Sequence, residues 1–408
     1  MFIEMVFFLF FGIAVGVVTG LIPGLHPNTV FVLLLSLSAF FTQVPGPYLL
    51  VFIISLALCN TFTNFIPSIL FGAPEPESCL SVLPGHKFLM AGKGYEALFL
   101  TVIGGIGVTA LAIITLPVLL FVLPAAYSLL QPYIHAILIF VVVWMCLTER
   151  NRAAAAIVFL LSGVFGFVGL NSLPSSTVLF PALTGLFGFS GLVVSLMSKI
   201  VIPPQKEPGS CHITKGYVKG SVAGWLAGML TGILPGVGAA QAGVVVAQTF
   251  RAKTREFLTA LGGINTANIF FTFVAFYTLG KTRSGAAWAV SQVLENITFF
   301  DVLLLACVGA IVCFLSVIIT LTIGKFIICR ITQFDYARLN VGVILSLLLM
   351  VFLFSGAIGL LVAFTGTCIG LLAILSGTRR THMMGFLILP TIFYFSGISS
   401  FLLALFGL

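Results

Sequence analysis

The sequence GLIPGLHPNTV, which runs from Gly20 to Val30, interrupts an apolar stretch with prolines, glycines, a histidine, an asparagine and a threonine. The stretch GILPGVGAAQAG, which begins at Gly232, repeats the order of a glycine, two aliphatic residues and a Pro-Gly pair. Proline removes a backbone donor and clashes with the preceding helical turn, and glycine permits the positive φ that reverses a chain. Each stretch therefore predicts a break in an apolar helix.

The composition indicates a membrane protein. Of the 408 residues 60% are hydrophobic and only 7% are charged, whereas soluble domains carry about 25% charged residues. The net charge of +8 does not indicate nucleic-acid binding, because Lys and Arg lie in short clusters between apolar runs, as in loops that face a negatively charged inner leaflet. The eight cysteines form neither a CxxC pair nor a Cys/His metal spacing, so we expect no disulfide framework, no metal site and no cofactor.

Ten apolar segments are long enough to cross a bilayer, which takes about 20 residues. Two further segments, 2–42 and 220–250, each contain a Pro-Gly break. The legs of 220–250 are about a dozen residues each, too short to cross a core of about 30 Å at 1.5 Å per residue. We predict a re-entrant hairpin there, while 2–42 either re-enters or crosses fully. The ten expected spans are 48–70, 95–118, 130–148, 153–170, 177–198, 257–279, 301–323, 339–356, 357–376 and 383–407.

The positive charges indicate the orientation. With the N-terminus outside and the spans alternating, 16 of the 18 Lys and Arg residues fall inside, and only Lys281 and Arg283 fall outside. The positive-inside rule asks for such a bias. We therefore expect a multi-pass protein of the cell membrane with its N-terminus outside.

The two breaks divide the chain into halves that share one plan, a broken hairpin followed by five spans. Because five is odd, the second half begins on the opposite face, which predicts two inverted-topology repeats. NTFTN at residues 60–64 follows the first break, and NTAN at 265–268 follows the second. Paired interruptions at matching places indicate a transporter binding site. The expected parts are a first membrane repeat over 1–200, a cytoplasmic linker over 201–219 and a second membrane repeat over 220–408.

The breaks provide the first group of candidate substrate-binding residues. A chain reversal at membrane depth leaves backbone groups that lipid cannot satisfy, so they face protein, water, an ion or a substrate. The second leg of each hairpin presents a helix N-terminus, which favours anions, and Asn28 and Thr29 suit capping or ligand contact. The candidates are Pro23, Gly24, Asn28 and Thr29 in the first half and Pro235, Gly236 and Gln241 in the second.

Polar residues within apolar segments supply the second group. Buried amides without partners are costly, so these side chains either bond between helices or coordinate substrate or a coupling Na⁺. The Asn-Thr pair in both halves favours the functional interpretation. The candidates are Asn60, Thr61, Asn64, Asn265, Thr266 and Asn268.

Few charged or titratable residues lie near these motifs. His26 is a candidate carrier of a coupling proton, since its ordinary pKa lies near neutral, or else a hydrogen-bonding residue. Lys281 and Arg283 are the remaining candidates for binding substrate. Three interpretations stay open for them: solvated loop residues, attraction of an anion from outside, or pairing with Glu75 and Glu77 of the GAPEPES loop.

Three stretches resemble the large membrane subunit of the tripartite tricarboxylate transporters, the TctA family. They are GLIPGLHPNT, the block NTFTNFIPSILFGAPEPESCLSVLPGHKFLMAGKGYEALFLT and GILPGVGAAQAG, and the resemblance is specific over 16–105 and 228–270. It implies a prokaryotic secondary transporter that imports organic carboxylates with a small membrane subunit and an extracytoplasmic binding protein. APEPES differs from the family's typical PGTPAS by two added carboxylates, and 281–283 replaces a second Pro-Gly pair.

Together these features predict an all-α polytopic membrane protein that is not an enzyme, since no nucleophile–base pair or phosphate loop stands in the sequence. It would move a small organic anion, a carboxylate, by alternating access coupled to Na⁺ or H⁺. Its partners would be this anion, the coupling ion, membrane lipid and the two accessory subunits, with a homodimer left open and no nucleic acid. Similar Pro-Gly breaks occur in polyprenyl-phosphate translocases, so transport of a lipid-linked phosphate is the alternative. A membrane scaffold or receptor is the alternative from a different functional class, and such a protein would lack an accessible polar cavity.

Overall fold

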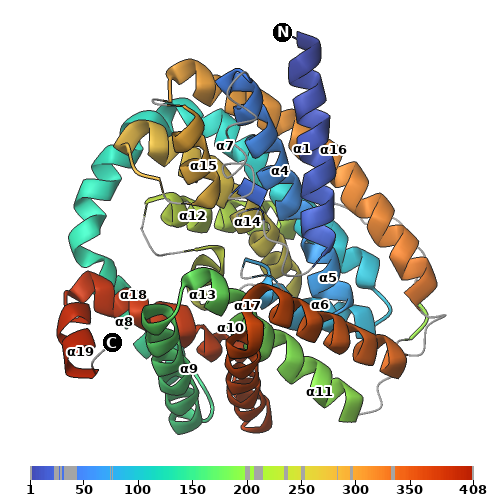
Figure 1. Cartoon of the computed structure of the whole chain (residues 1–408), viewed down its shortest axis with the longest axis vertical. Helices are drawn as coiled ribbons and strands as arrows, with labels where there is room; N and C mark the ends of the chain where they lie inside the picture. The colour runs from blue at the N-terminus through green and yellow to red at the C-terminus, as the bar shows by residue number, and fades with distance from the viewer. Residues whose placement is uncertain are drawn as a thin grey trace.

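All the secondary structure described in the computed structural model is helical (Figure 1). The described residues are 2–22, 27, 30–31, 44–73, 75, 77–197, 203–205, 215–233, 238–249, 253–282, 284–294, 297–331 and 336–406. The helices up to residue 197 are α1 (Phe2–Leu21), α4 (Gly46–Thr63), α5 (Phe65–Leu70), η1 (Cys79–Ser81), α6 (Val82–Met90), α7 (Gly94–Leu130), η2 (Gln131–Tyr133), α8 (Ile134–Leu147), α9 (Arg152–Ser172), α10 (Ser175–Leu183), the π-helical η3 (Thr184–Phe189) and α11 (Ser190–Met197). Those that follow are α12 (Lys215–Ile233), α13 (Ala239–Thr249), α14 (Thr254–Leu279), α15 (Gly285–Val293), α16 (Phe299–Ile331), α17 (Tyr336–Leu375), η4 (Arg380–Met384), α18 (Gly385–Ser396) and α19 (Ser399–Phe406).

The multi-pass helical architecture is confirmed, but the count of ten separate spans is not. Eight helical stretches in the described part of the chain are long and apolar enough to cross a membrane, or nine if the bent pair 380–396 and 399–405 is one span. The difference arises because two pairs of expected spans each lie in one helical stretch, of 54 and 36 residues. Expected spans 95–118 and 130–148 lie in one helical stretch, Gly94–Leu147, and expected spans 339–356 and 357–376 lie in Asn340–Leu375.

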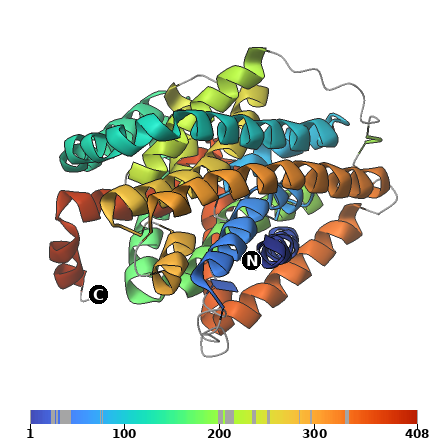
Figure 2. The same cartoon turned by 90° about the horizontal axis from the view of Figure 1, so that it is seen from above.

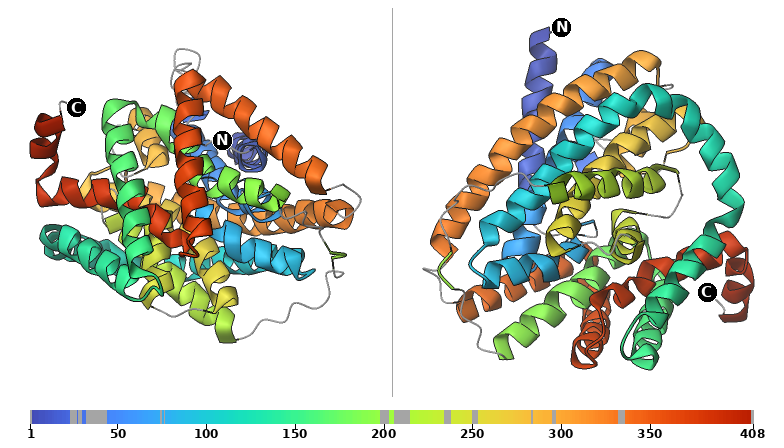
Figure 3. Two further views of the ribbon diagram at one scale, coloured as in Figure 1. Left: turned by 90° about the horizontal axis from the view of Figure 1, so that it is seen from below. Right: turned by 180° about the vertical axis from the view of Figure 1, so that it is seen from behind.

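Proline and glycine mark where these long helices change direction. α7 contains Pro117 and Pro124, and Figure 3 shows α7 and α8 rising to a bend and descending again. α17 leaves helical geometry at Gly356, where φ is 62° and ψ is −160°, and its two arms meet at an angle in Figure 3. The expected spans 339–356 and 357–376 meet at Gly356, so the sequence placed this boundary correctly.

Around residues 220–250 the helices differ in length from the expected hairpin. α12 has 19 residues rather than about a dozen, because its helical structure begins at Lys215, within the expected linker. α13 has 11 residues. Whether either Pro-Gly segment re-enters the membrane stays a prediction, because both breaks lie outside the described residues.

Two helix pairs pack at unusually short range through glycine. In α1, a Cβ added to Gly16 would lie 2.7 Å from the carbonyl oxygen of Leu56 in α4. In α12, a Cβ added to Gly220 would lie 2.8 Å from the carbonyl oxygen of Glu256 in α14. Small residues allow membrane helices to approach so closely, and these contacts fix α4 and α14 against their neighbours.

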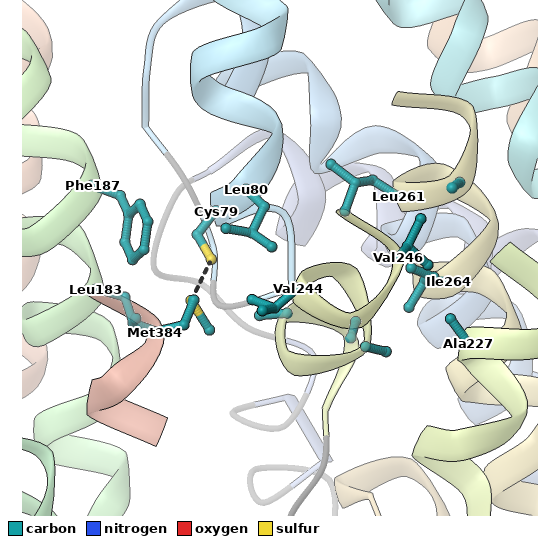
Figure 4. Packing of buried hydrophobic residues seen from close by; sticks show 14 of the residues in the cluster. Cys79, Leu80, Leu183, Phe187, Ala227, Val244, Val246, Leu261, Ile264 and Met384 are labelled. Carbon is teal, nitrogen blue, oxygen red and sulfur yellow. Dashed lines mark hydrogen bonds between the residues drawn. The ribbon is translucent and has the colours of Figure 1, made fainter. Parts of the chain in front are cut away.

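The helices form two groups that meet in a shared apolar core. Helices α7 and α16 run side by side across the first group, with α1 seen end-on beside α4 (Figure 2). The second group contains α9, α10, α17 and α18. Between them, η1 brings Cys79 and Leu80 next to Val244 of α13, and the Cys79 sulfur lies 3.9 Å from that of Met384 (Figure 4). The segment that precedes η1 is thereby fixed inside the molecule.

Candidate functional site

The helical stretch that carries NTFTN, Gly46–Leu70, has a one-residue break within this motif, at Asn64, whose backbone keeps right-handed helical angles. Pro67 has no N–H to donate to the Thr63 carbonyl, and its ring clashes with that carbonyl. Helix α4 accordingly ends at Thr63, Asn64 adopts φ −67° and ψ −14°, and α5 starts at Phe65. The break places the Asn and Thr side chains of the motif where they can bond to neighbouring elements.

Helix α14 meets α4 at this break. The hydroxyls of Thr61 and Thr266 lie 3.2 Å apart. Asn265 Nδ2 donates to the carbonyl oxygen of Thr61 at 3.2 Å and to Asn64 Oδ1 at 3.3 Å. Residues about 200 positions apart in the sequence thus form one hydrogen-bonded contact between helices, and whether these residues also bind a ligand stays a prediction.

The contact extends to α1 and to the loop after α5. Asn60 Nδ2 donates to Thr19 Oγ1 at 3.3 Å. Asn64 Nδ2 donates to Asn60 Oδ1 at 3.4 Å and to Glu75 Oε2 at 3.3 Å. We call this set the polar junction; its members are Thr19, Asn60, Thr61, Asn64, Glu75, Asn265 and Thr266. All seven side chains are buried.

Thr19 and Glu75 are the members that were not among the candidate site residues. The sequence singled out Glu75 only as a possible partner for Lys281 or Arg283. Glu75 is one of the two carboxylates that APEPES adds to the family's usual loop, 11 residues after Asn64. This difference from the family was the signal that could have pointed to Glu75. Glu75 is 1% exposed.

Three other candidates lie elsewhere. Gln241 is buried in the first turn of α13, where its Oε1 accepts from the Gly238 N–H at 3.0 Å, a local capping contact. Asn268 is half-buried on α14 and takes no part in the polar junction as far as the described residues show. Lys281 is exposed, donates to the Tyr127 hydroxyl at 3.2 Å and lies over its ring at 5.0 Å.

The position of Lys281 separates it from the polar junction. Helical rise places it about 20 Å beyond Asn265 along α14, so one small ligand cannot contact both. No ion pair joins Lys281 to Glu75 or Glu77 within the described part of the chain, so the pairing proposed from the sequence is wrong for this lysine. Several candidates lie outside the described residues and stay predictions: Pro23, Gly24, His26, Asn28, Thr29, Pro235, Gly236 and Arg283.

A second buried ionic group joins the α8–α9 connection to η4. His382 Nε2 donates to Glu149 Oε2 at 3.2 Å, and Arg379 Nε lies 3.3 Å from the same oxygen. Burial alone would raise the pKa of Glu149, but the hydrogen bonds from His382 and the Arg150 N–H and the charge of Arg379 outweigh it. The net effect is a pKa below the ordinary value. Sequence reasoning missed this group because its members stand 233 residues apart.

Comparison with known proteins extends the resemblance to almost the whole chain. The model of the tripartite tricarboxylate transporter TctA family matches residues 6–385. An uncharacterised protein of Methanocaldococcus jannaschii is 30% identical over 400 residues, which cover 95% of this chain and 98% of the relative. No solved structure matches the chain. The chain therefore belongs to the TctA family, the membrane component of the tripartite tricarboxylate transporters, and this is a family of transporters and not of enzymes.

Proposed function

We propose that the protein is a secondary-active permease that carries a small organic anion of the carboxylate class by alternating access, coupled to Na⁺ or H⁺. The observation that carries this proposal is the polar junction between α4 and α14, in a chain of the TctA family. Buried ionisable residues in membrane proteins are costly and mark substrate or ion pathways. The family implies two partners, an extracytoplasmic binding protein and a small membrane subunit.

The register of the glycine contacts supports an internal repeat. Three glycines of α1 have counterparts in α12 that stand 212 residues later: Gly12, Gly16 and Gly20 correspond to Gly224, Gly228 and Gly232. The residues that these glycines approach in α4 have counterparts in α14 that stand 208 residues later: Ser55, Cys59 and Thr63 correspond to Gly263, Ala267 and Phe271. One constant offset on each side of the contact is expected of a duplicated helix pair.

A threonine before the last glycine follows the same register. Thr19 Oγ1 donates to the Gly16 carbonyl at 3.1 Å, and Thr231 Oγ1 donates to the Gly228 carbonyl at 2.7 Å. The register aligns Asn60 with Asn268, three residues from the expected alignment of Asn60 with Asn265. The two Asn-Thr motifs therefore meet in space without being equivalent positions of the repeat.

In other contacts, helices of one half pack on helices of the other half. α7 of the first half packs along α14 of the second, whereas α16 of the second half packs along α4 of the first. Likewise α18 packs on α9, and α10 packs on α17. Such reciprocal packing supports two inverted repeats that embrace a site between them, the arrangement in which one unit can move against the other.

Uptake into proteoliposomes tests the proposed function. The purified protein would be reconstituted and offered citrate, succinate and a polyprenyl phosphate, each with and without an inward Na⁺ or H⁺ gradient. We expect gradient-dependent accumulation of a carboxylate. Movement of the polyprenyl phosphate alone would replace the carboxylate with a lipid-linked substrate. If the protein neither moves nor binds any of these anions, with or without the accessory subunits, the proposal is wrong.

A further inference from the structure

We propose that Glu75, together with the oxygen atoms around it in the polar junction, binds the cation that couples transport, as Na⁺ or as a proton on the carboxylate. This inference rests on the proposed function and gives the coupling step a location. The sequence left two ligands open for the amides of the junction, the substrate and a coupling Na⁺, and this inference assigns the junction to the cation.

Glu75 occupies a defined position inside the molecule. Its backbone is fixed on both sides by Ser78, because the Glu75 N–H donates to Ser78 Oγ at 3.2 Å and the Ser78 N–H donates to the Glu75 carbonyl at 3.2 Å. Ser78 in turn bonds through its hydroxyl to Ser68 of α5 at 2.5 Å. The carboxylate is therefore positioned beside the junction of α4 and α5, where it is buried.

The carboxylate of Glu75 belongs to a hydrogen-bonded set that also contains amide, carbonyl and hydroxyl oxygens. Glu75 Oε2 accepts from Asn64 Nδ2 at 3.3 Å, the same amide nitrogen donates to Asn60 Oδ1, and Asn64 Oδ1 accepts from Asn265. Carboxylate, amide, carbonyl and hydroxyl oxygens are the ligands that hard cations prefer.

A cation at this place would connect elements of both halves of the chain. Asn60 and Thr61 come from α4, Asn265 and Thr266 from α14, and Glu75 from the loop between α5 and η1. The described titratable groups on the packed elements are few. Glu77 and Cys79 follow on the same loop, and His86 of α6 lies 3.1 Å from the Ile69 carbonyl through its Nδ1. The charge of Arg380 in η4 also acts on His86. Burial lowers the pKa of His86 to about 4, which keeps this imidazole neutral near pH 7.

The test compares Glu75→Gln with Glu77→Gln, which removes the neighbouring half-buried carboxylate. Each purified protein would be melted in detergent in NaCl and in choline chloride of equal ionic strength, and at two pH values in choline chloride. A cation that binds the folded state raises the melting temperature. We expect the wild type and Glu77→Gln to be stabilised by Na⁺, by the lower pH or by both, and Glu75→Gln to lose this response.

Transport provides the second readout. Citrate uptake into proteoliposomes would be measured with an inward Na⁺ gradient at equal pH, and with an inward proton gradient at equal Na⁺. The ratio of uptake with and without the gradient does not depend on the fraction of active protein. We expect this ratio to fall to unity in Glu75→Gln and to stay above unity in Glu77→Gln. The gradient, of Na⁺ or of protons, that raises uptake by the wild type identifies the cation.

The outcomes separate the two proposals. If the wild type moves no anion but Glu75→Gln still abolishes the cation response in melting, the site stands and the proposed function fails. If Glu75→Gln keeps the response in melting or in the uptake ratio, or if Glu77→Gln loses it equally, the site is wrong. Should Glu75→Gln not fold, as judged by gel filtration, Glu75→Asp serves instead, and a cation response unchanged in affinity in that variant overturns the proposal.

Discussion

At the scale of single residues, Asn265 connects the two halves of the polar junction. Replacing it with Ala leaves the Thr61 carbonyl and Asn64 Oδ1 without their donor, which costs about 1–3 kcal/mol for buried acceptors. We expect Asn265→Ala to lose most carboxylate uptake while still folding, as measured by proteoliposome uptake and gel filtration. Asn171→Ala, which removes an exposed amide from α9, should keep wild-type uptake. Full uptake by Asn265→Ala would remove this residue from the site.

Glu149 provides a prediction on pH. Because its pKa is lowered in the folded protein, its ionised form stabilises the fold above the ordinary value of 4.5, and this contribution disappears as the pH falls through the folded pKa. We expect Glu149→Gln to melt at a lower temperature than the wild type at pH 7, with a gap that closes as the pH falls from 4.5 through the folded pKa. Thermal melting across pH 3.5–7.5 measures the gap. Arg150→Gln, at an exposed neighbour, is the control; a gap independent of pH would contradict the assignment.

What the sequence could reveal at this scale depended on repetition. Asn60, Thr61, Asn64, Asn265 and Thr266 were predicted because similar motifs stand in both halves, and the structure brings them together. Glu75, the partner of Asn64 in the GAPEPES loop, has no counterpart in the second half, so no sequence pattern placed it in the site. The same holds for Glu149 and its partner His382, since only tertiary packing connects residues so far apart.

At the scale of elements, glycine decides which helices can pack closely. A methyl group at Gly16 would meet the backbone and Cβ of α4 at 2.7–2.8 Å, and one at Gly228 would collide with Ala267 of α14. We expect Gly16→Ala and Gly228→Ala each to destabilise the protein by about 1–3 kcal/mol through overpacking. Gly342→Ala on α17, where nothing lies within 4 Å, is the matched control. Melting in detergent measures the three variants.

The outcome of these variants also tests the repeat. If Gly16 and Gly228 are equivalent positions, their Ala variants should lower the melting temperature similarly and reduce uptake together. A large effect at only one of them would contradict the equivalence of the two helix pairs. Gly342→Ala should be neutral or slightly stabilising, since alanine is favoured over glycine in a helix by about 0.5–1 kcal/mol.

The elements show why some breaks were predictable and others were not. Gly356 was correctly placed as a boundary because it lies in the short gap between two apolar runs. The expected span 48–70 continues across Pro67, and the structure likewise has one span there, Gly46–Leu70, in which the single residue Asn64 separates α4 from α5.

At the scale of the whole molecule, composition sufficed for the class of fold but not for the number of spans. Hydropathy reports where lipid is the solvent, and this predicted a multi-pass helical protein correctly. It does not report that two apolar runs follow each other in one bent helical stretch, so Gly94–Leu147, which holds α7, η2 and α8, was divided into two spans. The reciprocal packing of α7 on α14 and α16 on α4 lay beyond prediction, because hydropathy carries no information on partners.

Orientation is the property of the whole molecule that the charges predict most directly. α14 has 26 residues, about 39 Å of helix, and so can separate its flanks Lys253 and Lys281 across the membrane. With the N-terminus outside, Lys253 belongs to the basic inner clusters and Lys281 lies outside. In a variant without native cysteines, a membrane-impermeant maleimide on intact cells should label Lys281→Cys, whereas Lys253→Cys should react only after permeabilisation. Labelling with the reverse preference would mean that the orientation is opposite to the predicted one. Labelling of both residues in intact cells would mean that α14 does not cross the membrane.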